Sequence, residues 1–263
     1  MNLFQTILMS AVEGFTEFLP ISSTGHLILS AQALGIEQTD FVKSFLIIIQ
    51  LGAILAVVLL YFKTLLNTKI WPQILIAFIP SAIIGFILYN FIKDVLLENS
   101  FIVVLALIIG GIAFILIEYF NKNLKNQKDD RTEEKTSIES ISYKNAFIIG
   151  LFQIMSVVPG TSRAGSSILG ALILGINRKT AAEFSFILAV PTIFGATVLD
   201  IAQTKLAFNS DELFLLSIGF LGSFLFALIS IKWLIKYVQN HTFIAFGVYR
   251  IILGIIFYIV FLR

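Results

Sequence analysis

The chain has 263 residues, of which 58% are hydrophobic and only 13% are charged, and its mean hydropathy is +0.95. Soluble domains carry about 25% charged residues, so this composition excludes a soluble globular protein and predicts an integral membrane protein. The formal net charge of +2 argues against a nucleic-acid partner, and the absence of cysteine excludes disulfides and thiolate metal sites.

Six apolar stretches are long enough to cross a bilayer as helices, which takes about 20 residues each. They lie at 42–62, 72–92, 100–120, 183–203, 213–235 and 242–262. Two further apolar segments, 3–36 and 146–177, are interrupted in the middle, the first by Pro20 and the second by Pro159. Each half of such a segment is too short to cross, so we predict re-entrant helix-loop-helix hairpins. The predicted fold is all-α, with six transmembrane helices and two such hairpins.

The loop charges favour this topology, because cytoplasmic loops collect Lys and Arg. With two re-entrant hairpins, one side of the membrane holds 12 basic residues: Lys63, Lys69, Lys122, Lys125, Lys128, Arg131, Lys135, Lys144, Arg178, Lys179, Lys232 and Lys236. The other side holds 4: Lys43, Lys93, Lys205 and Arg263. If both interrupted segments crossed instead, the sides would hold 10 and 6. We therefore expect both termini outside and the polar loop in the cytoplasm.

That polar loop, 121–145, separates two related halves of a single membrane domain that spans 1–263. The halves, about 1–120 and 146–263, repeat a pattern: Pro20 to Gly25 resembles Pro159 to Gly165 at an offset of about 140 residues. Three crossings separate the two hairpins, so they enter from opposite faces and meet near the midplane. This is the arrangement of an inverted repeat.

The first hairpin carries two carboxylates, Glu13 and Glu17, which share one face of a helix at a spacing of four. Carboxylates close together in a low-dielectric site repel unless a proton or cation lies between them. Oxygen ligands suit a divalent cation, Mg²⁺ or Ca²⁺. The alternative is that both side chains extend to water at the membrane interface, although Phe15 and Phe18 argue for burial.

Hydroxyls follow Pro20 in an N-cap pattern, in which the freed backbone N–H groups at a helix start form an anion site. Ser22 and Thr24 are candidates for substrate binding, or they only cap the helix. Ser23 lies three residues before His26, a spacing at which the imidazole could activate the hydroxyl. A histidine in a core is often only hydrogen-bonded, but its place in this cluster favours a catalytic role.

The second hairpin carries a basic residue, Arg163, whose guanidinium matches phosphate oxygens in a bidentate manner. Its alternative role is to neutralise Glu13 or Glu17. The neighbouring substrate-binding candidates are Gly160, Thr161, Ser162, Ser166 and Ser167. Because ionisable groups at membrane depth are costly unless they are paired or line a cavity, the two clusters are predicted to form one site.

The two motifs, Glu13 to His26 and Pro159 to Arg163, together with the segments 183–191 and 41–56, resemble the undecaprenyl-diphosphate phosphatase family of bacitracin-resistance membrane phosphatases. The resemblance covers most of the chain. One departure is Ala164, which stands where the family pattern has serine. Another is Ser167, which stands where it has threonine, so a hydroxyl is kept only at the second position.

The resemblance implies hydrolysis of undecaprenyl diphosphate to undecaprenyl phosphate and inorganic phosphate, which recycles the lipid carrier of peptidoglycan synthesis. It further implies a divalent cation, a multi-pass protein of the bacterial cytoplasmic membrane with a site open to the outer face, and a homodimer. Either Ser23 attacks with His26 as base, or His26 or Glu17 activates water. An inverted-repeat transporter or flippase of a prenyl phosphate lipid is the alternative function.

Overall fold

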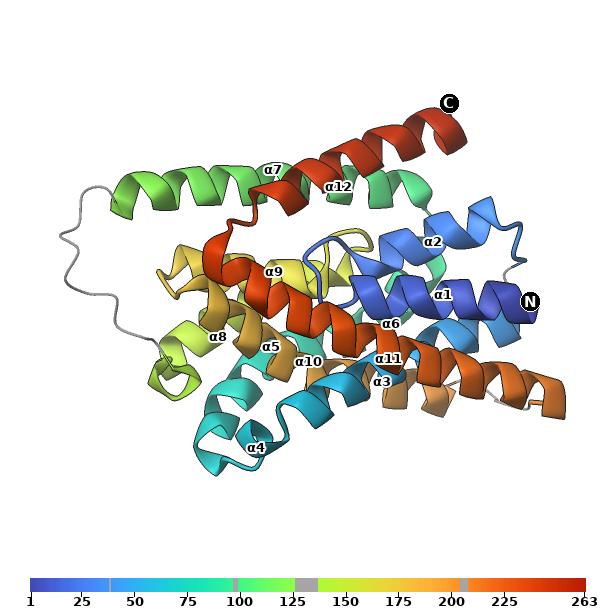
Figure 1. The fold of residues 1–263 in the computed structure, drawn as a ribbon, viewed down its shortest axis with the longest axis horizontal. Coiled ribbons are helices and arrows are strands. Elements are labelled where there is room, and N and C mark those ends of the chain that lie inside the picture. Colours follow the sequence, from blue (N-terminus) through green and yellow to red (C-terminus); the bar gives the residue numbers. More distant parts are fainter. Residues whose placement is uncertain (38, 97–98, 126–136, 204–207) are drawn as a thin grey trace.

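The computed structural model describes residues 1–37, 39–96, 99–125, 137–203 and 208–263, and all regular elements in these ranges are helical (Figure 1). The helices of the first half are α1 Leu3–Thr16, α2 Ser23–Ala33, α3 Asp40–Leu60, α4 Phe62–Leu65, α5 Trp71–Ile87, α6 Tyr89–Phe91 and α7 Ser100–Lys125. Those of the second half are α8 Tyr143–Gln153, α9 Arg163–Ile173, α10 Arg178–Gln203, α11 Ser210–Asn240 and α12 Ile244–Phe257. The short elements are η1 Thr68–Ile70, η2 Ile92–Leu96, η3 Ile138–Ser140, η4 Ile154–Val157 and η5 Tyr258–Leu262.

Six of the helical stretches are long and apolar enough to cross a membrane, which confirms the predicted number of spans. They are Asp40–Leu60, Thr68–Ile87, Ser100–Phe120, Arg178–Ala202, Ser210–Asn240 and Ile244–Leu262. The boundaries of some differ from the prediction because capping extends a helix beyond its apolar part. The fifth span, for example, begins at a capping box in which Asn209 and Glu212 exchange hydrogen bonds between side chain and backbone.

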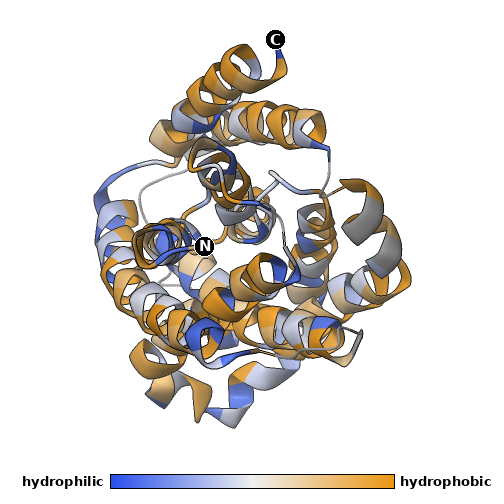
Figure 2. Cartoon of the chain, turned by 90° about the vertical axis from the view of Figure 1, so that its right-hand side faces the viewer, coloured by the Kyte–Doolittle hydropathy of each residue, from blue (hydrophilic) through white to orange (hydrophobic). Residues whose placement is uncertain are grey.

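The outer surface of the helix assembly is apolar, as a lipid-facing surface should be. Large hydrophobic side chains such as Phe86, Ile109 and Leu225 are more than half exposed. Figure 2, an end view, shows helices whose ribbons are mostly orange, with the hydrophilic segments gathered in loops and at helix ends. The composition of the chain is therefore explained by an apolar exterior together with an apolar interior.

Each of the two interrupted segments forms a pair of short helices, α1 with α2 and α8 with α9. That these pairs are re-entrant stays a prediction, and we keep the word hairpin for them. Figure 1 shows their connecting loops, blue and yellow, close together in the middle of the molecule. We call these loops, residues 17–22 and 158–162, the two tips. An ion pair between Glu17 and Arg163 joins the first tip to the start of α9. How the hairpins lie in a bilayer stays a prediction, and so does the inverted orientation of the halves.

Both halves repeat the same order, two short helices followed by three of the six spans. The repeat extends to backbone conformation. Ser22 and Ser162, 140 residues apart, are the N-caps of α2 and α9 and have φ angles of 73° and 75°. The division of the chain into two halves and a linker stays a prediction, since residues 126–136 of the predicted linker lie outside the described residues.

Glycines let the hairpins pack directly against the long helices. A Cβ atom on Gly14 of α1 would lie 2.5 Å from the carbonyl oxygen of Ser223 in α11. A Cβ atom on Gly150 of α8 would lie 2.4 Å from the carbonyl oxygen of Ala77 in α5. Each hairpin is therefore held at backbone distance from a long helix, which fixes where its tip lies.

Candidate active site

Each tip ends in a serine that caps the following helix. The Ser162 hydroxyl accepts a hydrogen bond from the Gly165 backbone N–H at 3.0 Å, and Ser22 accepts one from Gly25 at 3.3 Å. A positive φ at a residue other than glycine costs about 1–3 kcal/mol and is typically found at functional sites. The first turn of each helix also has N–H groups without intrahelical partners, which can bind an anion.

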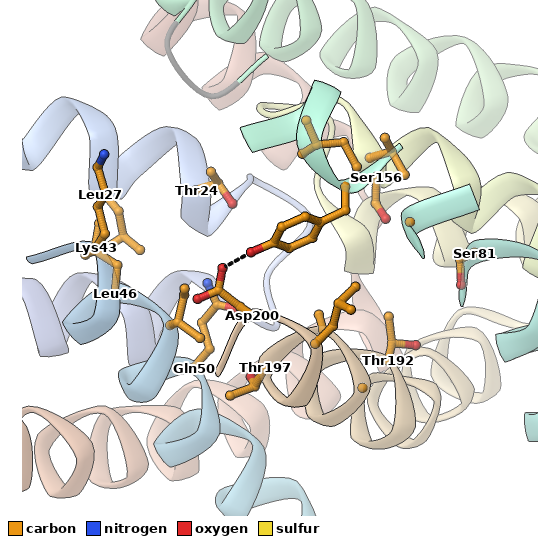
Figure 3. A pocket seen from close by; sticks show the side chains of 18 of the residues that line it. Thr24, Leu27, Lys43, Leu46, Gln50, Ser81, Ser156, Thr192, Thr197 and Asp200 are labelled. Atoms are coloured by element: carbon orange, nitrogen blue, oxygen red, sulfur yellow. Dashed lines mark hydrogen bonds between the residues drawn. The ribbon is translucent and has the colours of Figure 1, made fainter. Parts of the chain in front are cut away.

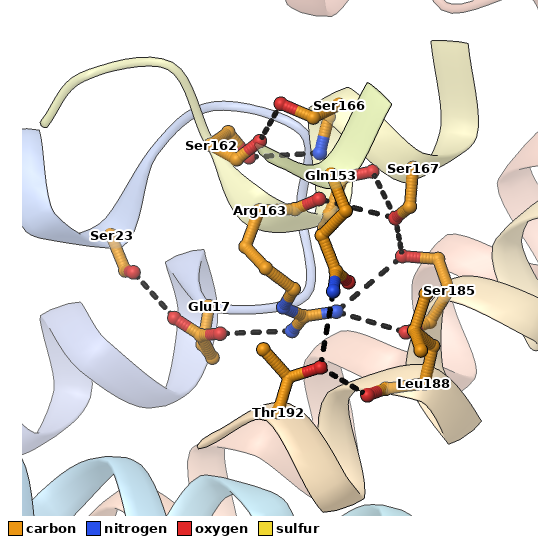
Figure 4. A network of polar contacts seen from close by, with 12 residues as sticks. Glu17, Ser23, Gln153, Ser162, Arg163, Ser166, Ser167, Ser185, Leu188 and Thr192 are labelled. Atoms are coloured by element: carbon orange, nitrogen blue, oxygen red, sulfur yellow. Dashed lines mark hydrogen bonds and ion pairs between the residues drawn. The ribbon is translucent and has the colours of Figure 1, made fainter. Parts of the chain in front are cut away.

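The tips meet through Glu17 and Arg163, whose side chains are 7% and 10% exposed (Figure 4). Arg163 Nη2 lies 2.9 Å from Glu17 Oε1, and Arg163 Nη1 donates to the Ser185 carbonyl oxygen of α10, also at 2.9 Å. Arg163 Nε is buried and has no hydrogen-bond partner among the described residues. The guanidinium therefore keeps its Nε donor free while it neutralises Glu17.

Glu17 also binds the candidate nucleophile. The Ser23 hydroxyl donates to Glu17 Oε2 at 2.5 Å, so one oxygen of this carboxylate holds Ser23 and the other holds Arg163 (Figure 4). The structure thus brings together three of the predicted catalytic residues, two from the first cluster and one from the second. A carboxylate hydrogen-bonded to a hydroxyl is placed to take its proton.

These side chains line a cavity of about 200 Å³. Its lining includes the predicted substrate-binding residues Ser22, Thr24, Gly160 and Ser162, as well as Glu17, Ser23 and Arg163. Gln50, Ser156 and Thr192 complete its polar wall, and the sequence analysis did not identify them. A small polar cavity lined by an arginine and helix N-termini suits a phosphate group.

A larger cavity, of about 1120 Å³, joins the small one (Figure 3). The two share Thr24, Gln50, Ser156, Thr192 and Ala196 as lining residues. The larger cavity is mostly apolar, and its far part reaches Lys43 at the start of α3 and Asp200 near the end of α10. An elongated molecule with an apolar chain and a phosphate at one end matches this combination.

His26 contacts Ser22 and Tyr249 rather than Ser23. Its Nδ1 lies 2.7 Å from the Ser22 carbonyl oxygen, and its Nε2 lies 2.7 Å from the Tyr249 hydroxyl of α12, whose ring stacks on the imidazole. A carbonyl oxygen only accepts, so Nδ1 carries the proton, and in the neutral imidazole Nε2 accepts from Tyr249. The predicted pair of Ser23 and His26 is therefore not formed in this structure, where Ser23 is bound to Glu17.

Glu13 lies behind the cavity, fully buried, and both of its carboxylate oxygens lack hydrogen-bond partners among the described residues. The described residues also contain no group of three His, Cys, Asp or Glu side chains able to hold a metal ion. Mg²⁺ is usually bound by one or two carboxylates together with substrate phosphates. The unpartnered oxygens of Glu13 fit that kind of site, and we take up the divalent cation below as a proposal.

The remaining predicted residues brace the second hairpin. Ser166 donates to the Ser162 carbonyl oxygen, and Ser167 donates to the Ser185 hydroxyl at 2.7 Å. Thr161 offers its backbone carbonyl oxygen to Arg250. None of these three lines the small cavity. Ala164, where the family pattern has serine, is fully buried and likewise not among the lining residues, so a hydroxyl at this position is not needed to form the cavity wall.

The sequence analysis missed two buried polar residues beside the site, Arg250 of α12 and Gln153 of α8, both fully buried. Gln153 donates to Ser81 at 2.6 Å and to Thr192 of the cavity wall at 3.2 Å. Both hydroxyls already donate to carbonyl oxygens, so the amide nitrogen must be the group that faces them. An isolated charge in a predicted span was the available signal for Arg250.

A comparison with protein families shows which family the chain belongs to. The family model described as "Bacitracin resistance protein BacA" matches residues 6–256. The chain belongs to this family. The match begins within α1 and ends within the sixth span, so it includes both tips and the first five spans in full.

Curated relatives of this BacA chain include undecaprenyl-diphosphatases from three bacteria. The protein from Sulfurihydrogenibium sp. (strain YO3AOP1) is 52% identical over 259 residues, which are 98% of this chain and 99% of that protein. The one from Aquifex aeolicus is 48% identical over 258 residues, 98% of each chain. The one from Persephonella marina is 49% identical over the same length and shares. These names describe a hydrolase and do not favour the transporter alternative.

Proposed function

We propose that the chain is an undecaprenyl-diphosphatase, which hydrolyses undecaprenyl diphosphate to undecaprenyl phosphate and inorganic phosphate. The observation that carries this proposal is Glu17, which holds the Ser23 hydroxyl and the Arg163 guanidinium on its two oxygens. Membership of the BacA family and the names of the relatives support the substrate. The reaction would return the lipid carrier to peptidoglycan synthesis and so confer bacitracin resistance.

Substrate binding is assigned to Arg163 and the starts of α2 and α9. The free Nε donor of Arg163 and the backbone N–H groups of both helix N-termini would hold the terminal phosphate. An incoming phosphate competes with Glu17 for the guanidinium. When Arg163 turns to the phosphate, Glu17 loses its ion-pair partner and is freed to accept a proton. Binding of the substrate would thereby prepare the base.

The chemical step is assigned to Ser23 and Glu17. The Ser23 oxygen attacks the terminal phosphorus while its proton passes to Glu17 Oε2, and the bond to the bridging oxygen breaks, so undecaprenyl phosphate leaves. Water then attacks the phosphoserine; as the bond between phosphorus and the Ser23 oxygen breaks, Glu17 returns the proton to that oxygen, and inorganic phosphate is released. His26 would hold the first tip in shape, since its ring and its backbone N–H both bind the Ser22 carbonyl oxygen.

We assign the divalent cation, Mg²⁺ or Ca²⁺, to Glu13 and Glu17 together with the substrate phosphates. Such a cation would neutralise the charge that develops on the phosphoryl oxygens. The position of Glu13 supports this assignment, because it is fully buried and its oxygens have no hydrogen-bond partner among the described residues. Replacing Glu13 with Gln should raise the Mg²⁺ concentration needed for half-maximal activity.

The prenyl chain is assigned to the larger cavity, whose far part lies where α3 begins and α10 ends, the same end of the molecule as the N-terminus. With the basic loops in the cytoplasm, this end would face the outside of the cytoplasmic membrane, as would both termini. The hairpins would then be re-entrant from opposite faces. The homodimer implied by the resemblance would be tested by the molar mass of the protein in nanodiscs.

The first experiment is phosphate release from undecaprenyl diphosphate by the purified protein in detergent, with Mg²⁺ or with EDTA. Glu17→Gln and Arg163→Ala each remove one partner of the ion pair between the tips. Glu118→Gln is the control, because it weakens another ion pair of a buried glutamate, between Glu118 and the partly exposed Arg178, whose closest atoms are 2.6 Å apart. We expect release that requires the cation, is lost in the two site variants and persists in the control.

Two results would contradict the proposal. If the folded wild-type protein releases no phosphate but moves intact lipid across a liposome membrane, the protein is a flippase and the proposed phosphatase function is wrong. If Glu118→Gln loses activity to the same degree as Glu17→Gln, breaking an ion pair that does not involve the tips has the same effect, and the assignment of the chemical step to Glu17 fails. Full activity in EDTA would remove only the cation assignment.

A further inference from the structure

Arg250 is a fully buried cation in the middle of the apolar helix α12. A charge at membrane depth is costly unless it is paired or hydrogen-bonded. No carboxylate forms an ion pair with Arg250 within the described parts of the chain. Its placement therefore depends on the neutral groups around it.

Those groups are five backbone carbonyl oxygens. In α7, Arg250 binds Leu107 through Nε at 3.3 Å and Ala106 through Nη2 at 3.0 Å. In the first tip, Nη1 binds Pro20 at 3.1 Å. In the second tip, Nη1 binds Thr161 at 3.0 Å and Nη2 binds Gly160 at 2.9 Å. A guanidinium has five N–H donors, so every one of them is used.

Glycines, which have no side chain, leave room for the Arg250 guanidinium. A Cβ atom on Gly110 of α7 would lie 2.2 Å from Arg250 Nη2. A Cβ atom on Gly165 of α9 would lie 3.2 Å from Arg250 Nη1. Glycines on two helices therefore line the guanidinium, and any larger residue at Gly110 would displace it.

The contacts also set the orientation of the second tip. In a trans peptide the carbonyl and the following N–H point in opposite directions. Because the Gly160 and Thr161 carbonyls point at Arg250, the N–H groups of Thr161 and Ser162 point away from it. The Thr161 N–H closes a turn on Val158 at 3.1 Å. Arg250 thus fixes the orientation of the peptide that leads into Ser162, and Ser162 lines the small cavity.

We propose that Arg250 is a positioning residue that ties the two tips together and so brings Ser23 and Glu17 of one hairpin to Arg163 of the other. It acts through main-chain carbonyls and is not among the residues that line the small cavity. The proposal rests on the phosphatase function above. Because every residue has a backbone carbonyl, substitutions in the tips would not remove these hydrogen bonds. Only a substitution of Arg250 removes them.

Arg250→Lys tests this proposal, because it keeps the charge and loses the fork that spans both tips. Arg178→Lys is the matched control: it keeps a charge and loses two hydrogen bonds, to Glu118, which do not involve the tips. Hydrogen exchange measured by mass spectrometry compares the tips, 17–22 and 158–162, with the spans. We expect exchange at the tips to become about tenfold faster or more in Arg250→Lys alone, with protected spans in both variants.

Phosphate release gives the second readout, normalised to the folded fraction found from the protection of the spans. A misplacement of about 1 Å can cost about 100-fold in rate, so we expect kcat to fall about 100-fold in Arg250→Lys. We expect KM to change less than about threefold, because Arg163 still binds the phosphate. Arg178→Lys should keep the wild-type kcat.

The proposal would be overturned if the tips of the Arg250→Lys protein exchanged hydrogen as slowly as those of the wild type. It would also be overturned if the kcat of this variant lay within about twofold of wild type. Equal acceleration of the tips in Arg178→Lys would also overturn it, because the effect would then not be specific to Arg250. If the wild-type protein releases no phosphate, the proposed function fails, whereas the exchange measurement still tests whether Arg250 holds the tips.

Discussion

Replacing Ser23 with Ala decides between attack by serine and attack by water. The change removes one hydroxyl, 7% exposed, which donates a 2.5 Å hydrogen bond to Glu17. A hydrogen bond to a charged group contributes about 1.5–3 kcal/mol to stability, so the variant should still fold. If Ser23 is the nucleophile, its loss should lower kcat at least about 1000-fold, which is about 4 kcal/mol of activation free energy.

Attack by water predicts a different magnitude for the same variant. The space left by the hydroxyl can hold a water molecule bound to Glu17 Oε2, and kcat should then stay within about tenfold of wild type. The assay is phosphate release under saturating substrate, accompanied by rapid acid quenching with substrate labelled in its terminal phosphate. Transfer of label to the peptide that contains Ser23 is expected in wild type and absent in the variant.

Ser230→Ala is the matched control, since Ser230 is another buried serine whose hydroxyl donates one hydrogen bond, to the Phe15 carbonyl oxygen at 2.8 Å. It should lose about 0.5–1.5 kcal/mol of stability, the contribution of a hydrogen bond between neutral groups, and keep kcat within about twofold. A Ser23→Ala protein with near wild-type turnover and no labelled intermediate in wild type would refute covalent catalysis. Glu17 would then be assigned to water.

Three further substitutions test other parts of the site. Arg163→Lys keeps the charge but loses the fork, so kcat/KM should fall roughly 10- to 100-fold, mainly through KM, and unchanged kinetics would contradict the phosphate-binding role. Gly160→Ala would place a Cβ atom 2.5 Å from the Val103 carbonyl oxygen at a residue with φ of 91°. Gly175 also has a positive φ, 78°, but no atom lies within 4 Å of its Cβ position, so Gly160→Ala should lower Tm further than Gly175→Ala. Equal Tm values would show that the contact with Val103 is unimportant. Tyr249→Phe removes the donor to His26, so the ¹⁵N resonances of His26 should shift, and identical spectra would mean that the hydrogen bond is absent in solution.

The spans were predictable because hydropathy adds up over about 20 residues, so single polar side chains do not hide the signal. The helix ends were less predictable, since they depend on caps such as Asn209 and on where the next element packs. The tips were found from Pro20 and Pro159, which interrupt apolar sequence where a span would continue. Their positive φ at serine had no sequence signal, as glycine is the usual residue there.

Within the site, the sequence indicated Ser23, His26 and Glu17 as candidates, but it did not predict which of them Ser23 contacts. Ser23 and His26 share a short spacing, but the conformation of Ser22 directs His26 to the Ser22 carbonyl and Tyr249, and leaves Ser23 to Glu17. Arg250 was missed for a different reason. Its partners are backbone carbonyls, which every residue carries, so no pattern of residue types marks them.

The repeated serines have one more consequence, which concerns asymmetry. Ser22 and Ser162 present the same backbone, yet the next residue is Ser23 in one copy and Arg163 in the other. At the same offset, Glu17 corresponds to Val157. In the proposed mechanism, one copy supplies attack and proton transfer, and the other supplies an anchor for negative charge. Under that proposal, the doubled scaffold has a single reaction centre with a fixed direction, so a bound diphosphate would be cleaved from one side only.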